Sequence, residues 1–173
     1  MNPRITLKKG KEKSLITNRH PWIFSGAVQD VSDDFSPGDV AEVYSSEGVF
    51  LALAYFNLDN SLAGRVLSFD QGTIESILSN AMDKALILRK TLMNHAVTNC
   101  YRWINAEEDG LPGLIVDVYG AVCVIQVSTL GMEKLKQTII DLLITKGSFE
   151  SVYEKSTSSA RELEGLFCAT CFR

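Results

Sequence analysis

The stretch VAEVYSSEGVFLALAYF, residues 40–56, contains two apolar runs separated by the polar turn SSEG. Its β-branched and aromatic residues favour strands, and a short glycine-containing loop between two such runs is typical of a β-hairpin. We therefore predict strands at residues 40–44 and 49–56. The residues before them, SPGD at 36–39, have proline second and glycine third, which is typical of a type II turn.

Residues on both sides of this hairpin extend the β pattern. LAGRVLSF (62–69) predicts a strand after a polar loop, and the alternation in RITLK (4–8) predicts another. The apolar pair at 15–16 indicates a short helix that Pro21 would end, after which SGAVQDV (25–31) again predicts a strand. Because these short strands follow one another at near-regular spacing, they predict a small β-barrel-like domain.

The pattern changes at Gly72. Residues 73–95 have apolar side chains at three- and four-residue spacing, with Thr73 or Ser76 as candidate N-caps and basic residues late, which predicts a long helix. The elements predicted after it are strands at 101–105, 114–120 and 121–129, a helix at 132–147 that Gly147 would cap, and a strand at 151–155. The predicted fold class is therefore mixed α+β: a β pseudobarrel over residues 1–72, then a small α-β-β-β-α-β domain over residues 73–173.

The composition is that of a globular protein with a packed core. It is 46% hydrophobic and 22% charged, with a mean hydropathy of +0.06. No apolar run approaches the roughly 18 residues of a membrane span, and no apolar segment follows the charges at the N-terminus as in a secretory signal. The four cysteines are scattered rather than arranged as a disulfide framework. We therefore expect a reducing, cytoplasmic location without membrane association.

Charge is unevenly distributed along the first domain, although the whole chain has a net charge of −4. Residues 1–24 contain six basic residues against Glu12 alone, whereas residues 25–60 contain seven acidic residues and no Lys or Arg. The overall acidity argues against a globally basic nucleic-acid binder. A local basic patch can nevertheless attract phosphate.

Four patterns that suggest chemistry lack the features that a functional site requires. Three consecutive carboxylates in EEDG (107–110) lack the spacing of a hard-cation loop, and the CATC at 168–171 has no second pair of ligands. His20 and His95 lie in different predicted domains with no nucleophile pattern beside them. No glycine-rich loop of the dinucleotide or Walker type is present. We therefore predict no catalytic, cofactor-binding or metal-binding residues in this chain.

The tryptophans and their neighbours allow two interpretations. Trp22, Phe24 and Trp103 are predicted to be core residues, because aromatic side chains are mainly buried hydrophobic mass. In this interpretation Pro21, Trp22, Ile23 and Phe24 close the barrel. If Trp22 were exposed beside the lysines, it would instead offer a stacking platform for unpaired bases.

Several stretches together resemble a known family. LKKGKEKSLITNRHPWIFSGAV, PGDVAEVYSSEGVFLALAYFN and GRVLSF resemble the N-terminal PUA domain of the bacterial 23S ribosomal RNA cytosine-C5 methyltransferases, which are class I SAM-dependent enzymes. YRWINAEEDGLPGLIVDVYG and VYEKSTSSARELEGL resemble the central α+β domain of the same family. The resemblance extends to Leu166.

The resemblance implies a PUA-like RNA-binding domain over 1–72 and a central domain over 73–173. It also implies that the C-terminal Rossmann-like catalytic domain is absent, so that the chain is truncated before it. SAM is then a cofactor of the full-length family, with no SAM-binding residue in this chain. The RNA-binding residues carried over are Lys8, Lys9, Lys11, Lys13, Arg19 and Arg65. Arg102, Asp109 and Asp117 are expected to be architectural, through salt bridges and turn hydrogen bonds.

Three hypotheses follow. The first is that the chain is the RNA-binding and substrate-positioning portion of a ribosomal RNA methyltransferase, inactive alone and bound to 23S ribosomal RNA. The second is that it is a fragment of an active methyltransferase. The third is a dimerising scaffold or degenerate remnant without RNA affinity. A homodimer is considered because central-domain strands without their usual neighbour would expose an apolar edge.

Overall fold

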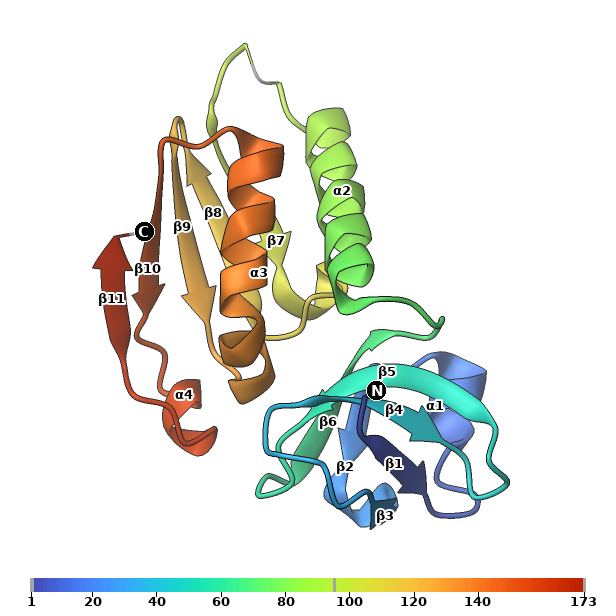
Figure 1. Ribbon diagram of the computed structural model, residues 1–173. Helices are drawn as coiled ribbons and strands as arrows, with labels where there is room; N and C mark the ends of the chain where they lie inside the picture. The colour runs from blue at the N-terminus through green and yellow to red at the C-terminus, as the bar shows by residue number, and fades with distance from the viewer. Residues whose placement is uncertain (1, 95, 173) are drawn as a thin grey trace. The chain divides into compact units, whose positions relative to one another are not determined.

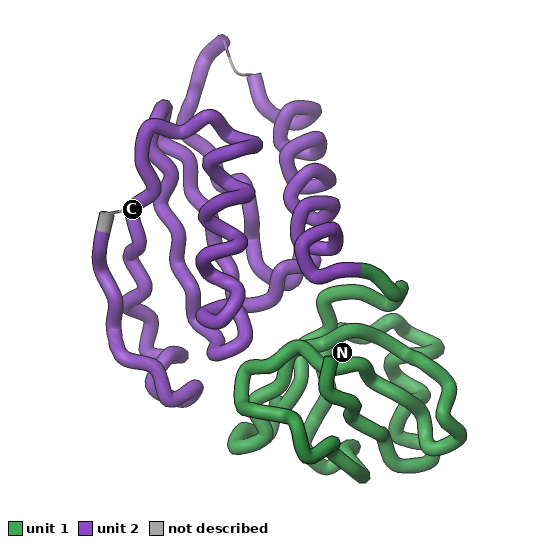
Figure 2. Tube along the Cα trace, viewed as in Figure 1, with its two compact units in different colours: residues 1–72 green, residues 73–173 purple. Residues whose placement is uncertain are grey.

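The computed structural model of the chain describes residues 2–94 and 96–172. It divides into two compact units, Met1–Gly72 and Thr73–Arg173 (Figure 2). Each unit has its own sheet.

The first unit is a six-stranded sheet with one short helix, labelled in Figure 1. Its elements are β1 (Arg4–Leu7), α1 (Lys13–Asn18), β2 (Trp22–Phe24), a 3₁₀ turn η1 (Ser25–Ala27), β3 (Val28–Val31), β4 (Val40–Tyr44), β5 (Phe50–Phe56) and β6 (Leu62–Ser68). The strand order is β2-β6-β5-β4-β1-β3, in which β1 runs parallel to β4 and every other pair is antiparallel. The mixed α+β fold with a curled N-terminal sheet agrees with the predicted fold class.

The turns around the central hairpin have the predicted geometry. β4 and β5 pair antiparallel, with Val40 opposite Tyr55. In the turn before them, the amide of Asp39 donates to the carbonyl of Ser36 over 2.9 Å, and Gly38 has a φ of 88°. A positive φ at the third residue is what a type II turn requires, and glycine adopts it without a steric penalty. Both the hairpin and the turn are confirmed.

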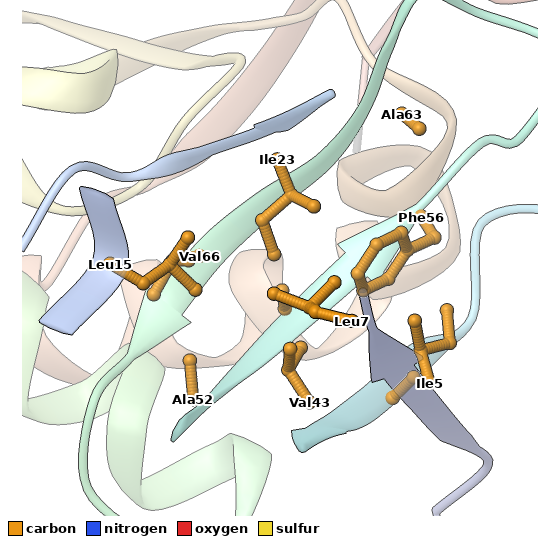
Figure 3. Close-up of a cluster of buried hydrophobic side chains, with 11 residues drawn as sticks. Ile5, Leu7, Leu15, Ile23, Val43, Ala52, Phe56, Ala63 and Val66 are labelled. Carbon is orange, nitrogen blue, oxygen red and sulfur yellow. The ribbon is translucent and has the colours of Figure 1, made fainter. Parts of the chain in front are cut away.

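Buried aliphatic side chains of the first unit form a core cluster together with Phe56 (Figure 3). β1 contributes Ile5 and Leu7, while α1 contributes Leu15 and β2 contributes Ile23. Both α1 and β2 are therefore anchored to the core through one side chain each. Burial of one such aliphatic side chain stabilises the fold by about 1.5–3 kcal/mol.

The prediction that Trp22 and Phe24 close the barrel is wrong. Their exposed fractions are 38% and 54%, whereas Ile23 between them is 1% exposed. Successive side chains of a strand point to opposite faces, so only one face of this three-residue strand meets the core. β2 is also an edge strand, paired with β6 alone. Trp22 and Phe24 are therefore left on the outer face.

The second unit is a five-stranded sheet with helices on one face, as Figure 1 shows. Its elements are α2 (Ile74–Leu92), β7 (Cys100–Asn105), a 3₁₀ turn η2 (Ala106–Asp109), β8 (Leu114–Tyr119), β9 (Val122–Val127), α3 (Leu130–Gly147), β10 (Ser151–Ser156), α4 (Ala160–Leu163) and β11 (Ala169–Phe172). The strand order is β11-β10-β9-β8-β7; β9 and β10 are parallel and the other pairs antiparallel.

The long helix α2 begins and packs as predicted. The hydroxyl of Thr73 accepts from the amide of Ser76 over 3.3 Å, so Thr73 is the N-cap. The indole of Trp103 is fully buried and donates from Nε1 to the carbonyl of Met82 over 3.1 Å. Burial of Trp103 is therefore confirmed. His95 lies outside the described residues.

Two features at the C-terminal side differ from the predictions. α3 ends at Gly147, but the cap is Ser148, which has a φ of 53°, and a side chain at 147 would overlap the ring of Phe149. Beyond β10, α4 and β11 were not predicted. β11 pairs antiparallel with β10, with Glu154 opposite Cys171. β11 therefore covers one edge of β10.

Candidate functional site

The basic segment is defined here as Lys8, Lys9, Lys11 and Lys13. These residues lie in the connection from β1 to α1 and at the first position of α1, and all four are exposed. The turn within it is closed by a hydrogen bond from the amide of Lys11 to the carbonyl of Lys8, over 3.0 Å, with Gly10 at a φ of 84°. The turn therefore presents several ammonium groups to solvent from one short connection.

One lysine of this segment also contacts the connection after β2. The ammonium of Lys8 donates to the carbonyl of Gly26 over 3.1 Å. The amide of Lys8 donates to the carbonyl of Ala27 over 2.9 Å. These two bonds hold the start of the basic segment against η1.

The two arginines predicted as RNA-binding residues lie on aromatic rings. Arg19 has a φ of 46° at the C-cap of α1, and its guanidinium carbon lies 4.4 Å from the centroid of Phe69. Arg65 is half-buried on β6, 6.0 Å from the centroid of Tyr55. Both distances are within the range of cation–π contacts. The six predicted residues thus share one unit but do not converge on one point.

A groove lies between α1 and β2, with a volume of about 270 Å³. It is lined by residues from α1, β2 and the segments beside them. These are Lys11, Ser14, Leu15, Trp22, Ile23, Phe24, Gly26 and Ala27. The groove therefore joins the basic segment to the exposed aromatic side chains of β2. We name it the α1–β2 groove.

Trp22 is held in place by its neighbours. Its amide donates to Nδ1 of His20 over 3.1 Å, and the two rings meet edge to face at 5.6 Å and 74°. Trp22 also pairs with Arg65 across the β2–β6 ladder. The sequence prediction missed the exposure of Trp22 and Phe24. The available signal was the position of these aromatic residues close to basic residues in the sequence.

Asp109 of the EEDG turn and Asp117 of β8 have structural partners. Arg89 binds Asp109 through two hydrogen bonds of 2.8 and 2.6 Å, and the amide of Asn105 donates to the same carboxylate. Arg102 binds Asp117 with a closest distance of 2.8 Å. The expected salt bridges of Arg102, Asp109 and Asp117 are therefore present. The Arg89–Asp109 pair ties α2 to the η2 turn.

The buried thiol of Cys123 is not a reactive nucleophile, and the described residues contain no cluster of candidate metal ligands. Burial raises the pKa of the Cys123 thiol to about 12, which leaves it protonated at neutral pH. Among the residues that the structure describes, no three His, Cys, Asp or Glu side chains gather as metal ligands would. Within the same residues, none of the helices has the length and apolar character to cross a membrane.

A SAM site does not fit the parallel strand pair of the second unit, β9 and β10. In open α/β sheets ligands bind beyond the carboxyl ends of parallel strands, at helix N-termini. Here β9, α3 and β10 form such a unit, but the amide of Leu130 at the start of α3 donates to the carboxylate of Glu164. The side chain of Thr129 also lies against Gly113, where a Cβ would overlap it. This position is therefore filled by the chain's own residues.

Comparison with known proteins agrees with the fold of the first unit. Residues 5–69 match the family model of the PUA-like domain. The chain thus contains a PUA-like domain followed by a small α+β unit.

Curated relatives match nearly the whole chain. It is 36% identical over 167 residues to "Ribosomal RNA large subunit methyltransferase I" of Vibrio cholerae, covering 96% of this chain and 42% of that protein. The protein of the same name from Pseudoalteromonas atlantica is 35% identical over 170 residues. The chain therefore spans about 42% of the length of these relatives.

Solved structures share the fold. A putative SAM-dependent methyltransferase from Streptococcus mutans superposes with a TM-score of 0.74 at 19% identity, over 97% of this chain and 42% of that one. A putative methyltransferase complexed with SAH has the same TM-score over 88% of this chain. At this level of identity the likeness concerns the fold alone.

Proposed function

We propose that this chain is the RNA-binding and substrate-positioning portion of a SAM-dependent ribosomal RNA methyltransferase. The observation that carries the proposal is the 36% identity to "Ribosomal RNA large subunit methyltransferase I" across 96% of the chain. The PUA-like domain with its exposed basic segment supports it. The proposed partner is 23S ribosomal RNA, and the proposed target of the complete enzyme is C5 of a cytosine.

The chemistry of RNA binding is assigned to the basic segment together with Arg19 and Arg65. Exposed ammonium groups bind phosphate oxygens and release the counterions condensed on the RNA. Such contacts set the position and orientation of the RNA without reading its sequence. The unit that presents them would therefore orient the RNA for a reaction performed elsewhere.

Methyl transfer itself is assigned to a catalytic domain outside this chain. The filled end of the β9–α3–β10 unit and the protonated Cys123 both support this division. So does the share of the relatives' length that the chain does not match. We propose that the chain alone is inactive and that SAM binds to the remainder of the complete protein.

Binding to a 23S ribosomal RNA fragment tests this function. Neutralising Lys9, Lys11 and Lys13 together as K9Q/K11Q/K13Q removes three exposed charges and should weaken binding about 10-fold or more at low salt. Fluorescence anisotropy of the labelled fragment measures the affinity. A matched triple, K84Q/K90Q/K155Q, removes three exposed lysines of the second unit and should change the affinity little.

Two outcomes would contradict this assignment. One is an affinity that the K9Q/K11Q/K13Q triple leaves unchanged. The other is an equal loss in both triples, which would indicate a general charge effect. Absence of any RNA affinity in the unsubstituted chain would favour the scaffold hypothesis instead.

A further inference from the structure

We propose that Cys168 and Cys171 form a redox latch, in which oxidation of the two thiols to a disulfide releases β11 from β10. This inference is independent of RNA binding and assigns a regulatory role to the CATC segment at residues 168–171. β11 is the edge strand of the second sheet and lies beside β10 (Figure 1). The disulfide and the paired strand exclude each other, because they require different backbone conformations.

The spacing of the two cysteines is the first observation. Ala169 and Thr170, which lie between them, both belong to β11 and are therefore extended. Three residue steps along a strand span roughly 10 Å. The two Cα atoms of a disulfide lie within about 7 Å of each other. The thiols of Cys168 and Cys171 can therefore join only if the extended backbone between them folds into a turn.

The second observation shows which end of the segment must move. The carbonyl of Phe167, next to Cys168, accepts from Nε of Arg161 over 2.8 Å. Arg161 is 3% exposed and also donates to the carbonyl of Val127. Removing partners from a buried charge is strongly destabilising, so the start of the CATC segment is anchored. β11 is a four-residue edge strand, and it is therefore the part that yields.

The third observation is that the thiol of Cys171 takes part in the pairing. It donates to Oε2 of Glu154 over 3.6 Å, directly across the ladder between β10 and β11. The other oxygen of this buried carboxylate accepts from the ammonium of Lys136 over 3.1 Å. A disulfide sulfur has no proton to donate. Oxidation of Cys171 therefore removes a cross-strand hydrogen bond in addition to bending the strand.

The oxidant in this proposal is a small-molecule disulfide such as oxidised glutathione. Cys168 is exposed, so its thiolate can attack one sulfur of this reagent, which forms a mixed disulfide and expels one glutathione thiolate. Once β11 opens, the thiolate of Cys171 attacks the Cys168 sulfur and expels the second glutathione. The two cysteines lose two protons and two electrons, and both electrons reduce the glutathione disulfide.

Hydrogen exchange of the complete chain measures the release of β11, because unpaired backbone amides of a strand edge exchange with solvent. The chain is equilibrated with reduced or with oxidised glutathione, and peptide mass spectrometry identifies the disulfide. In the oxidised sample we expect a bond between Cys168 and Cys171, and exchange about 10-fold or more faster in β10 and β11. The β7–β8 pair should keep its protection.

Cysteine substitutions show whether the two thiols act as a pair. C168S and C171S should each abolish both the disulfide and the faster exchange, because either one removes half of the pair. C100S provides the matched control, since it changes an exposed thiol on β7. It should respond to oxidised glutathione as the unsubstituted chain does.

A substitution on β10 tests the mutual exclusion without altering the CATC segment. Lys155 is exposed and lies opposite Thr170 in the β10–β11 ladder. K155G weakens this strand and should shift the equilibrium between dithiol and disulfide about 2- to 5-fold toward the disulfide. T157G, at an exposed position after β10, is the control and should leave this equilibrium unchanged. Titration with a series of glutathione ratios measures both.

Three outcomes would overturn the latch. The first is a disulfide between Cys168 and Cys171 that leaves the protection of β10 and β11 unchanged. The second is the absence of this disulfide even in fully oxidised glutathione. The third is an equal shift of the dithiol–disulfide equilibrium in K155G and T157G, which would show that strand pairing does not oppose oxidation.

Discussion

Gly64 lies where β2, β5 and β6 meet, opposite Ile23 on one side and Phe56 on the other. A Cβ at this position would overlap the buried ring of Phe56. Because the interior is close-packed, the ring cannot move without displacing the rest of the core. The absence of a side chain at 64 is therefore a packing requirement.

G64A is expected to lower the free energy of unfolding of the first unit by about 1–3 kcal/mol, as overpacked cores do. G26A is the matched control, since no atom lies within 4 Å of its added Cβ. It should change the free energy of unfolding by less than about 0.5 kcal/mol. Urea denaturation followed by circular dichroism measures both. Equal effects of the two substitutions would refute the packing argument.

At the same scale, Trp22 and Phe24 show a limit of sequence reasoning. A three-residue strand with apolar side chains at every position fits either face, because a shift of one residue exchanges the buried and exposed sets. With Ile23 inside, the two aromatic residues are outside. The burial of Trp103 could be predicted, because the strand that contains it extends on both sides of it. In the structure, α2 covers this side chain.

A buried ionic network joins the elements at the C-terminal side of the second unit. Glu154 on β10 is 1% exposed and binds Lys136 of α3, which also contacts Glu133. Arg161 of α4 donates to the carbonyl of Val127 over 2.6 Å and to Glu133 over 3.0 Å. The network therefore fastens α4 to α3, β9 and β10.

Stability should depend on pH through Glu133. Burial alone would raise the pKa of this carboxyl, but hydrogen bonds and charge from Lys136 and Arg161 outweigh it, so the pKa is lowered below 4.5. A lowered pKa in the folded state stabilises the protein above pH 4.5, and this contribution is lost as the pH falls through the folded-state value.

E133Q is therefore expected to be less stable at neutral pH, with a shallower loss of stability on acidification. Urea denaturation between neutral pH and about pH 3 measures this dependence. The control is E162Q, at an exposed position of α4. An acid-dependence of E133Q as steep as that of the unsubstituted chain would contradict the assignment.

The elements themselves differed in how far they could be predicted. Hairpins such as β4–β5 and the capped helix α2 carry local signals in turn glycines, caps and periodicity. β11 has four residues and gains its order by pairing with β10, and α4 is fixed by the contacts of Arg161. Such tertiary contacts leave no periodic pattern in the sequence. The same holds for the α1–β2 groove, which unites residues from separate segments.

At the scale of the whole molecule, charge is concentrated rather than balanced. The net charge is −4, yet the basic segment presents four exposed lysines. Acidic surfaces elsewhere repel phosphate, so RNA would be directed to the basic segment and away from other faces. This uneven distribution of charge could be predicted from the sequence. The position of the basic segment beside the α1–β2 groove required the structure.

The salt dependence of binding to a 23S ribosomal RNA fragment tests the central claim most directly. With four to six phosphate contacts, the logarithm of the association constant should fall with the logarithm of salt concentration at a slope of roughly −3 to −5. In K9Q/K11Q/K13Q the slope should become shallower by about 2 to 3. A slope near zero, or one that this triple leaves unchanged, would contradict the proposal that the basic segment binds ribosomal RNA.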